Sequence, residues 1–154
     1  MEREIIFRGK RIDNGEWVEG SYFNILDSKC FLKEKEVLKH HIVNEFGKFE
    51  VVDPETISQY TGMKDSTGKR IFEGDILEFE DLGEEGYEYK EGFDFINTAS
   101  VVFVKGRFEL KNFWSNNSGV MEEMGNDHDE FMGVFSGSKI IGNIHDNPAL
   151  LEVQ

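Results

Sequence analysis

Residues 52–79 constrain the fold more than any other segment, because short apolar runs alternate there with turn-forming residues. Asp53 and Pro54 open the segment with a turn, since an Asp side chain accepts backbone hydrogen bonds and Pro fixes φ. Residues 65–68 (DSTG) have the composition of a β-turn whose glycine takes a positive φ. Turns so closely spaced exclude a long helix and predict short antiparallel strands.

Two strands and one sharp turn are expected within this segment. Residues 56–61 (TISQYT) are rich in β-branched and aromatic side chains, which favours a strand, and Gly62 should end it. Residues 76–80 (ILEFE) alternate apolar and acidic side chains, as in a half-buried strand. Between the two strands, residues 73–75 (EGD) must reverse the chain, so Gly74 should have a positive φ.

Residues 62–69 (GMKDSTGK) superficially resemble a phosphate-binding loop. That loop has four residues between its glycines and a Ser or Thr after its lysine. Here five residues separate Gly62 from Gly68, and Arg70 follows Lys69. The run is therefore expected to be a plain turn, and neither a nucleotide nor another cofactor is predicted.

Two hairpins are predicted elsewhere in the chain. Asn14-Gly15 is the strongest short hairpin signal, and it lies between strand-like runs at residues 4–12 and 16–23. A second hairpin, residues 99–113, turns at Gly106-Arg107. Antiparallel pairing of neighbouring strands is thus expected at both ends of the central segment.

Little helix is expected. Residues 120–131 have room for a short helical turn. Residues 139–145 form the last predicted strand. After it, Asn147 and Pro148 match the N-cap and first position of a terminal helical turn, which Leu150-Leu151 would dock.

Three blocks along the chain carry a recognisable set of motifs. The central block is Pro54-Glu55-Thr56, Gln59-Tyr60-Thr61-Gly62, Lys64-Asp65, Gly68-Lys69 and Glu73-Gly74-Asp75-Ile76-Leu77; the opening block is Phe7-Arg8-Gly9-Lys10 and Gly15-Glu16-Trp17-Val18-Glu19-Gly20; the closing block is Ile141-Gly142-Asn143-Ile144-His145-Asp146-Asn147-Pro148 and Leu150-Leu151. In this order the blocks resemble the YopX family, small proteins encoded by phages and prophages. Residues 83–138 depart from the family pattern.

The resemblance implies a mainly β protein of antiparallel hairpins, with an SH3-like barrel and a short C-terminal helical turn. It implies no assigned biochemical function and supplies no catalytic residue. Residues 1–154 are expected to form one compact unit, with a subdivision into an N-terminal β part, residues 1–61, and an SH3-like barrel part, residues 62–154. The turns should depend on Asp53, Pro54, Gly62, Asp65, Gly68, Gly74, Asp75, Gly142, Asn143, Asn147 and Pro148.

The composition suits a folded cytoplasmic protein. Hydrophobic residues make up 38% of the 154 residues and include 14 Phe, enough to fill a core. Cys30 is the single cysteine, which excludes an intramolecular disulfide framework and a cysteine zinc site. With neither a signal peptide nor a long apolar run, the sequence predicts a cytoplasmic location and no membrane contact.

The net charge of −14 is concentrated in two segments. Residues 80–95 hold seven acids and one base, and residues 121–130 hold five acids and no Lys or Arg. Both are expected to be outward loops. An acidic protein repels phosphate backbones, so direct nucleic-acid binding is disfavoured. A stacking platform would also need cations between exposed aromatics, and only residues 105–108 (KGRF) offer a fragment of one.

Asp127, His128 and Asp129 are the candidate metal ligands, because carboxylates and imidazoles bind cations. Consecutive side chains converge on one ion only in a loop folded for it, and this run lacks the ligand order of a calcium hand. His40 and His41 are neighbours in an expected strand, so they point to opposite faces and cannot share an ion. No catalytic residue is assigned.

Two functional classes follow. The first is a non-enzymatic interaction protein, a homo-oligomer whose acidic loops or strand edges also engage a host or phage protein. The second is a metal-dependent hydrolase or nuclease that uses carboxylates of the two acidic segments. Because no catalytic set is present, the sequence favours the first class. The like charges predict that self-association tightens as salt rises.

Overall fold

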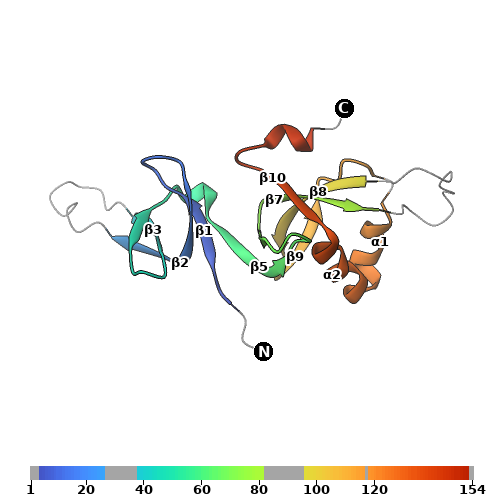
Figure 1. Cartoon of the computed structure of the whole chain (residues 1–154), viewed down its shortest axis with the longest axis horizontal. Helices are drawn as coiled ribbons and strands as arrows, with labels where there is room; N and C mark the ends of the chain where they lie inside the picture. Colours follow the sequence, from blue (N-terminus) through green and yellow to red (C-terminus); the bar gives the residue numbers. More distant parts are fainter. Residues whose placement is uncertain (1–3, 27–37, 82–95, 117, 153–154) are drawn as a thin grey trace. The chain divides into compact units, whose positions relative to one another are not determined.

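The chain forms two compact units in the computed structural model, Met1–Tyr60 (unit 1) and Thr61–Gln154 (unit 2) (Figure 1). The structure describes residues 4–26, 38–81, 96–116 and 118–152. Strands dominate, and they pair as antiparallel ladders in both units. The expected mainly β fold of antiparallel hairpins is confirmed.

Unit 1 is built on one sheet. Its strands are β1 (Phe7–Lys10), β2 (Trp17–Leu26), β3 (Leu38–Val43), β4 (Phe49–Val51) and the start of β5 (Ser58–Lys64), in the order β4-β3-β2-β1-β5. The predicted hairpin joins β1 to β2 through Gly15, which has a φ of +72°. After β4, an isolated bridge pairs Val52 with Arg11, so the ladder turns back towards β1.

The inner face of this sheet encloses a small apolar core. Ile42 on β3 and Val52 after β4 are fully buried. A Cβ on Gly9 would lie 3.0 Å from the Val52 side chain, so this packing requires glycine. Tyr22 stacks on His40, and its hydroxyl lies 2.8 Å from Nδ1 of that ring. The packing uses one face of the sheet and leaves the other face outward.

The turn predicted at Asp53 is present as a short 3-10 turn, η2 (Pro54–Thr56), which the Asp53 side chain caps. Thr56 does not start a strand as predicted. It ends η2, and its hydroxyl accepts a hydrogen bond from the backbone N–H of Lys10 at 2.8 Å. The prediction that Gly62 ends the following strand is also wrong, because β5 continues through this glycine at a φ of +88°.

Unit 2 combines a four-stranded sheet with two helices. Its elements are β6 (Arg70–Phe72), β7 (Asp75–Glu80), β8 (Ile96–Val104), β9 (Arg107–Lys111), α1 (Gly119–Asn126), α2 (His128–Gly137), β10 (Lys139–Asn143) and η3 (Pro148–Leu151). The sheet has the order β10-β7-β8-β9, and β6 lies beside the end of β5 in this unit. β8 and β9 turn at Lys105 and Gly106, one residue before the predicted position. An SH3-like barrel is broadly consistent with these strands, although the described ladders of the four-stranded sheet do not close.

The two helices are the main departure from the sequence-based expectation, which placed only a short helical turn in residues 120–131. Val120, Phe131 and Phe135 are buried in the core cluster of unit 2, which also contains Leu77 of β7. The two phenylalanines are four residues apart, as in one face of a helix. Gly133 between them, and the other glycines and the acids of the two helices, weaken that pattern, so the helices follow mainly from burial against the sheet.

The predicted turn at residues 65–68 is confirmed, and Asp65 does more than close it. Oδ1 of Asp65 accepts hydrogen bonds from the N–H groups of Thr67 and Lys69 at 2.9 Å and from the Thr67 hydroxyl at 2.7 Å. Oδ2 accepts one from the N–H of Ile140 on β10 at 3.1 Å. Burial alone would raise the pKa of Asp65, but these hydrogen bonds outweigh it and lower the pKa. The carboxylate therefore fastens this turn to β10.

Gly74 has the positive φ predicted for it, at +82°. Its N–H donates to the Val101 carbonyl at 2.8 Å, and its own carbonyl accepts from the N–H of Ile144 at 2.9 Å. A Cβ at this position would lie 3.3 Å from Cγ1 of Ile144. The turn between β6 and β7 therefore needs both the conformation and the small size of glycine.

We expect Gly74→Val to lower the free energy of unfolding by about 1–3 kcal/mol, because a β-branched residue is strained at positive φ and crowds Ile144. Denaturant unfolding measures the change. Gly133→Ala is the control, since no atom lies within 4 Å of a Cβ at this helical position, and alanine favours a helix. A Gly74→Val protein as stable as the wild type would contradict the assignment.

Acid should destabilise unit 2 through Asp65. Folding lowers the pKa of this carboxyl, so its contribution is complete above the unfolded-state value of about 4 and is lost as the pH falls through the lower folded-state value. Asp65→Asn should cost about 1–3 kcal/mol at pH 7 and clearly less at pH 2–3. Urea unfolding at the two pH values measures this, with the exposed Glu152→Gln as control. An equal cost at both pH values would refute the charged-acceptor role.

Candidate interaction surface

The outward face of the unit 1 sheet carries an aromatic and aliphatic patch. In the strand register, Phe23 on β2 lies opposite His41 on β3, and Val43 on β3 lies opposite Phe49 on β4. Residues directly opposite each other share a face, and alternate residues along a strand do so too. We call this surface the aromatic patch, and its residues are Phe23, Ile25, His41, Val43 and Phe49.

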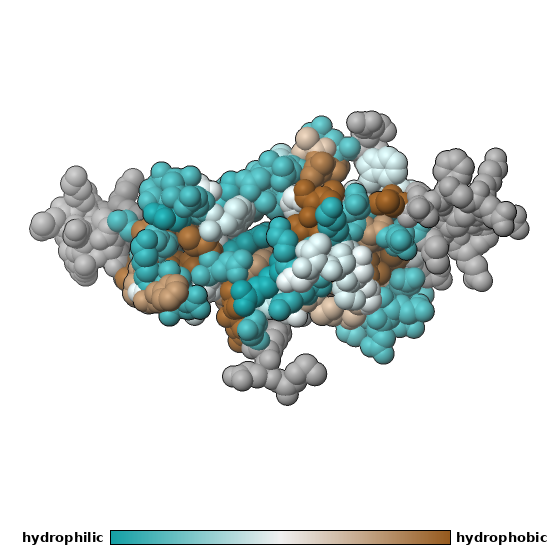
Figure 2. Space-filling model, viewed as in Figure 1, coloured by the Kyte–Doolittle hydropathy of each residue, from teal (hydrophilic) through white to brown (hydrophobic). Residues whose placement is uncertain are grey.

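The aromatic patch is partly open to solvent. Phe49 is 54% exposed and Ile25 is 44% exposed. The Phe49 ring meets Phe23 edge-on, with centroids 5.4 Å apart at 72°, and meets His41 at 6.2 Å and 77°. Unit 1, at the left of Figure 2, shows brown apolar areas between teal hydrophilic ones. Contiguous exposed apolar surface of this kind is typical of interaction sites.

Basic side chains share the same face of the sheet. The Arg8 guanidinium lies over the Trp17 ring at 4.6 Å, and Lys10 Nζ lies 5.6 Å from the centre of that ring. Arg8 also donates from Nε to the Ser58 hydroxyl at 3.1 Å. Lys39 is exposed and lies opposite Ile25 of the aromatic patch. These contacts hold two of the cations against aromatic surface rather than free in solvent.

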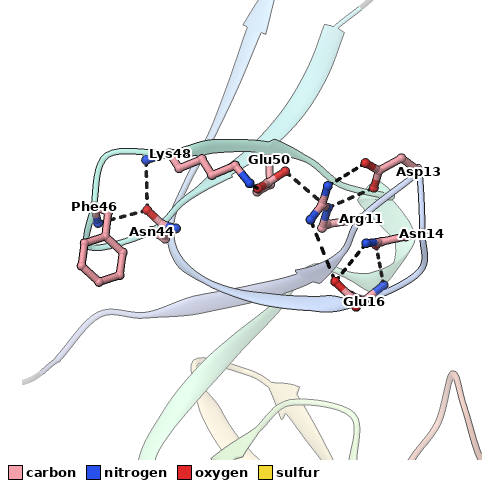
Figure 3. Close-up of polar contacts among 8 residues, drawn as sticks. All are labelled: Arg11, Asp13, Asn14, Glu16, Asn44, Phe46, Lys48 and Glu50. Atoms are coloured by element: carbon pink, nitrogen blue, oxygen red, sulfur yellow. Dashed lines mark hydrogen bonds and ion pairs between the residues drawn. The ribbon is translucent and has the colours of Figure 1, made fainter.

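Ion pairs link the turns at one end of this sheet (Figure 3). Arg11 forms a bidentate pair with Asp13, with its Nε at 2.9 Å and its Nη2 at 2.6 Å from the carboxylate oxygens. Its guanidinium also lies 3.3 Å from Glu50, and Lys48 Nζ lies 2.6 Å from the same glutamate. The hydrogen bond from Arg11 lowers the pKa of Asp13. The network therefore connects the β1–β2 turn to β4.

The β3–β4 turn presents a single exposed ring. Oδ1 of Asn44 accepts hydrogen bonds from the N–H groups of Phe46 and Lys48 at 3.0 and 2.9 Å. Gly47, with a φ of +74°, completes the turn. Phe46 is 85% exposed, and its ring points away from the ion pairs in Figure 3. The turn thus holds its backbone rigidly while offering an apolar side chain outward.

The remaining predicted turn residues differ in what they contact. Beyond those described above, Gly68 has a φ of +86°, and the buried Asp75 accepts from the N–H of Phe72 at 2.8 Å. Asn143 accepts from the N–H groups of His145 and Asp146. A Cβ on Gly142 would meet Asn147, whose side chain does not cap η3 although Pro148 starts it. Leu150 is 40% exposed rather than docked.

The candidate metal ligands lie at the start of α2 rather than in an outward loop, so the expectation of a loop over residues 121–130 is corrected. Asp127 is the N-cap of α2, and its Oδ1 accepts from the N–H groups of Asp129 and Glu130 at 3.1 Å. Within the described residues, no three ligand-type side chains group as they would around an ion. The other acidic segment, residues 80–95, was also expected to be an outward loop, but Glu80 ends β7 and Asp81 is buried; residues 82–95 and Cys30 lie outside the described part.

The acids of the two helices lie close enough to repel one another. Burial raises the pKa of Glu123 on α1, and the nearby carboxylates of Glu130, Asp81 and Asp127 raise it further. Asp81 is buried, and its Oδ1 accepts from the N–H of Gly119 at the start of α1 at 2.9 Å. The buried Asp81 carboxylate thus fixes the start of α1, while Asp127, Asp129 and Glu130 are exposed near it in the chain's helix pair.

The aromatic patch is not evident in the sequence, because its residues come from three strands, β2, β3 and β4. Residues 105–108, the fragment that the sequence offered for stacking with bases, are less available for such a contact. Arg107 pairs with Glu109 at 2.6 Å, and Phe108 packs on Phe103. The sequence signal for the patch was that Trp17, Phe23 and Ile25 lie at odd-numbered positions of one strand, β2, and so share a face. It becomes informative only once the strand register places His41 and Phe49 beside it.

The geometry defines a two-unit, mainly β protein with an exposed aromatic patch and, in the described residues, no grouped metal ligands. The chain belongs to the YopX protein family, whose model matches residues 6–152 and so confirms the resemblance seen in the motif blocks. No curated protein matches the sequence. The crystal structure of protein EF1440 from Enterococcus faecalis is similar at 23% identity, covering 98% of this chain and 100% of that chain with a TM-score of 0.47. No described helix is long and apolar enough to cross a membrane.

Replacing Arg11 by Gln should raise the pKa of Asp13 towards its ordinary value, because the largest stabilising contact of that carboxylate is lost. An NMR titration of side-chain carboxyl signals measures this directly. Asp65, whose pKa is lowered by hydrogen bonds that do not involve Arg11, serves as the internal reference and should keep its lowered pKa in the variant. An unchanged Asp13 titration in the variant would show that the ion pair does not form in solution.

Proposed function

We propose that this protein is a non-enzymatic interaction protein that works as a homo-oligomer, with the outward face of the unit 1 sheet as its contact surface. The observation that carries the proposal is the aromatic patch, in which Phe49 is 54% exposed although it packs against two other rings. Aromatic side chains in such clusters supply much of the binding energy at protein interfaces. Basic residues at the edge of the patch would give orientation and specificity.

The same proposal includes the setting in which the protein acts. Membership of the YopX family supports a phage or prophage origin and action in the cytoplasm. A partner from the host or the phage could use the same surface as the second copy. The family itself carries no assigned activity that this chain would inherit.

Size-exclusion chromatography with light scattering tests the proposal at micromolar concentration. Wild type should have a mass above one chain, and Phe49→Ser should shift it towards one chain. The free energy of unfolding should fall by only about 0.5–1.5 kcal/mol, because Phe49 is half-exposed and loses its edge-on contacts with Phe23 and His41. Phe103→Ser is the matched control, since Phe103 is 46% exposed on unit 2. A wild-type mass of one chain at both low and moderate salt would refute the oligomer.

A further inference from the structure

We propose that the oligomer is head-to-tail: the unit 1 outward face of one copy binds the α1–α2 surface of a second copy. This inference rests on the proposed function and names the partner of its contact surface. The contact would join two different surfaces of the chain rather than the same surface twice. Charge complementarity between those surfaces is the argument for it.

The two units differ strongly in charge. Unit 1 has nine Lys and Arg against twelve Asp and Glu, whereas unit 2 has eight against nineteen. Residues 112–138, which include both helices, contain five acids and no Lys or Arg. Asp127, Asp129 and Glu130 are exposed at the start of α2. The helix pair therefore presents an acidic surface with no cation of its own.

The helix pair also offers apolar surface for the aromatic patch. Met121 on α1 is 39% exposed, and Met132 on α2 is half-buried at the edge of the core cluster. Methionine side chains pack adaptably and make favourable contacts with aromatic rings. An acidic surface with an exposed methionine thus matches both features of the unit 1 face.

The unit 1 face has the opposite balance of charge. Arg8, Lys10 and Lys39 lie on it at register positions of β1 and β3, and Glu19, opposite Arg8, is the acid among the described residues of this face. Two copies meeting through this same face would bring like charges together. The head-to-tail contact instead brings the cations towards the carboxylates of Asp129 and Glu130.

A nucleic acid fits this surface less well. The rings of the aromatic patch meet edge-on, at 72° and 77°, so they do not present parallel faces for successive bases. The net charge of −14 also repels a polyanion. An acidic protein surface carries its charges beside apolar side chains. It can therefore contact the aromatic patch and the cations at its border at the same time.

Two charge reversals test the contact in the full-length chain. Lys39→Glu changes the unit 1 face, and Glu130→Lys changes the helix surface; both side chains are exposed, so the fold should be unaffected, as circular dichroism can verify. Lys64→Glu and Glu152→Lys are matched controls, because each makes the same change of charge at another exposed position. Glu130→Gln removes the charge without reversing it and should have an intermediate effect.

Each reversal alone should weaken self-association by about tenfold or more, because like charges then face each other. An equimolar mixture of the two variants should recover association, with masses above one chain, at an affinity close to that of the wild type. In that mixture the unit 1 face of the Glu130→Lys chain and the α1–α2 surface of the Lys39→Glu chain are both unchanged, so these two surfaces can still bind each other. Sedimentation velocity at matched concentrations measures both results. Association of the wild type should weaken as salt rises, opposite to the expectation from net charge alone.

Four results would overturn the inference in distinguishable ways. If Glu130→Lys associates like the wild type while Phe49→Ser does not, the protein is an oligomer but the contact joins two unit 1 faces. If the mixture stays at one chain, the two surfaces do not meet. A monomeric wild type would remove both this inference and the proposed function. Binding of a labelled single-stranded oligonucleotide that Lys39→Glu abolishes would assign the face to nucleic acid instead.

Discussion

Buried aspartate carboxylates that accept backbone N–H groups hold unit 2 together. Asp65 reaches the N–H of Ile140 on β10, and Asp81 reaches the N–H of Gly119 at the start of α1. Burying a charge is costly unless hydrogen bonds compensate for it, and here the donors are groups that would otherwise lack partners at turns and a helix end. The position of the helices, and with it the acidic surface, depends on this arrangement.

Unit 1 is stabilised differently, and the difference explains its exposed surface. Its core is small, with Ile42 and Val52 fully buried on one face of the sheet. The charged network around Arg11 lies at the turns and adds little apolar burial. An antiparallel sheet packed on one face can leave its other face in solvent. One unit thus offers apolar and basic surface, and the other offers acidic surface.

Local chemistry made the turns predictable from the sequence. Asp65, Gly68 and Gly74 have the predicted conformations because each depends on its own side chain and on a few neighbouring residues. The helices over residues 119–137 were underestimated, because burial of Phe131 and Phe135 against a remote sheet decides them. The aromatic patch could not be predicted, since only the strand register brings His41 beside Phe23. Contacts between residues far apart in the sequence were therefore the part of the structure that the sequence alone did not predict.

The pairing of β7 with β10 has a consequence for synthesis on the ribosome. The β7 register with β10 joins Leu77 to Ile140, and the Asp65 carboxylate needs the N–H of the same isoleucine. By contrast, the ladders of unit 1 connect residues within the first 60. The nascent chain can therefore complete the first sheet long before β10 emerges. Until then β7 has one edge without its native neighbour, the state in which a strand is most prone to wrong pairing and to capture by chaperones.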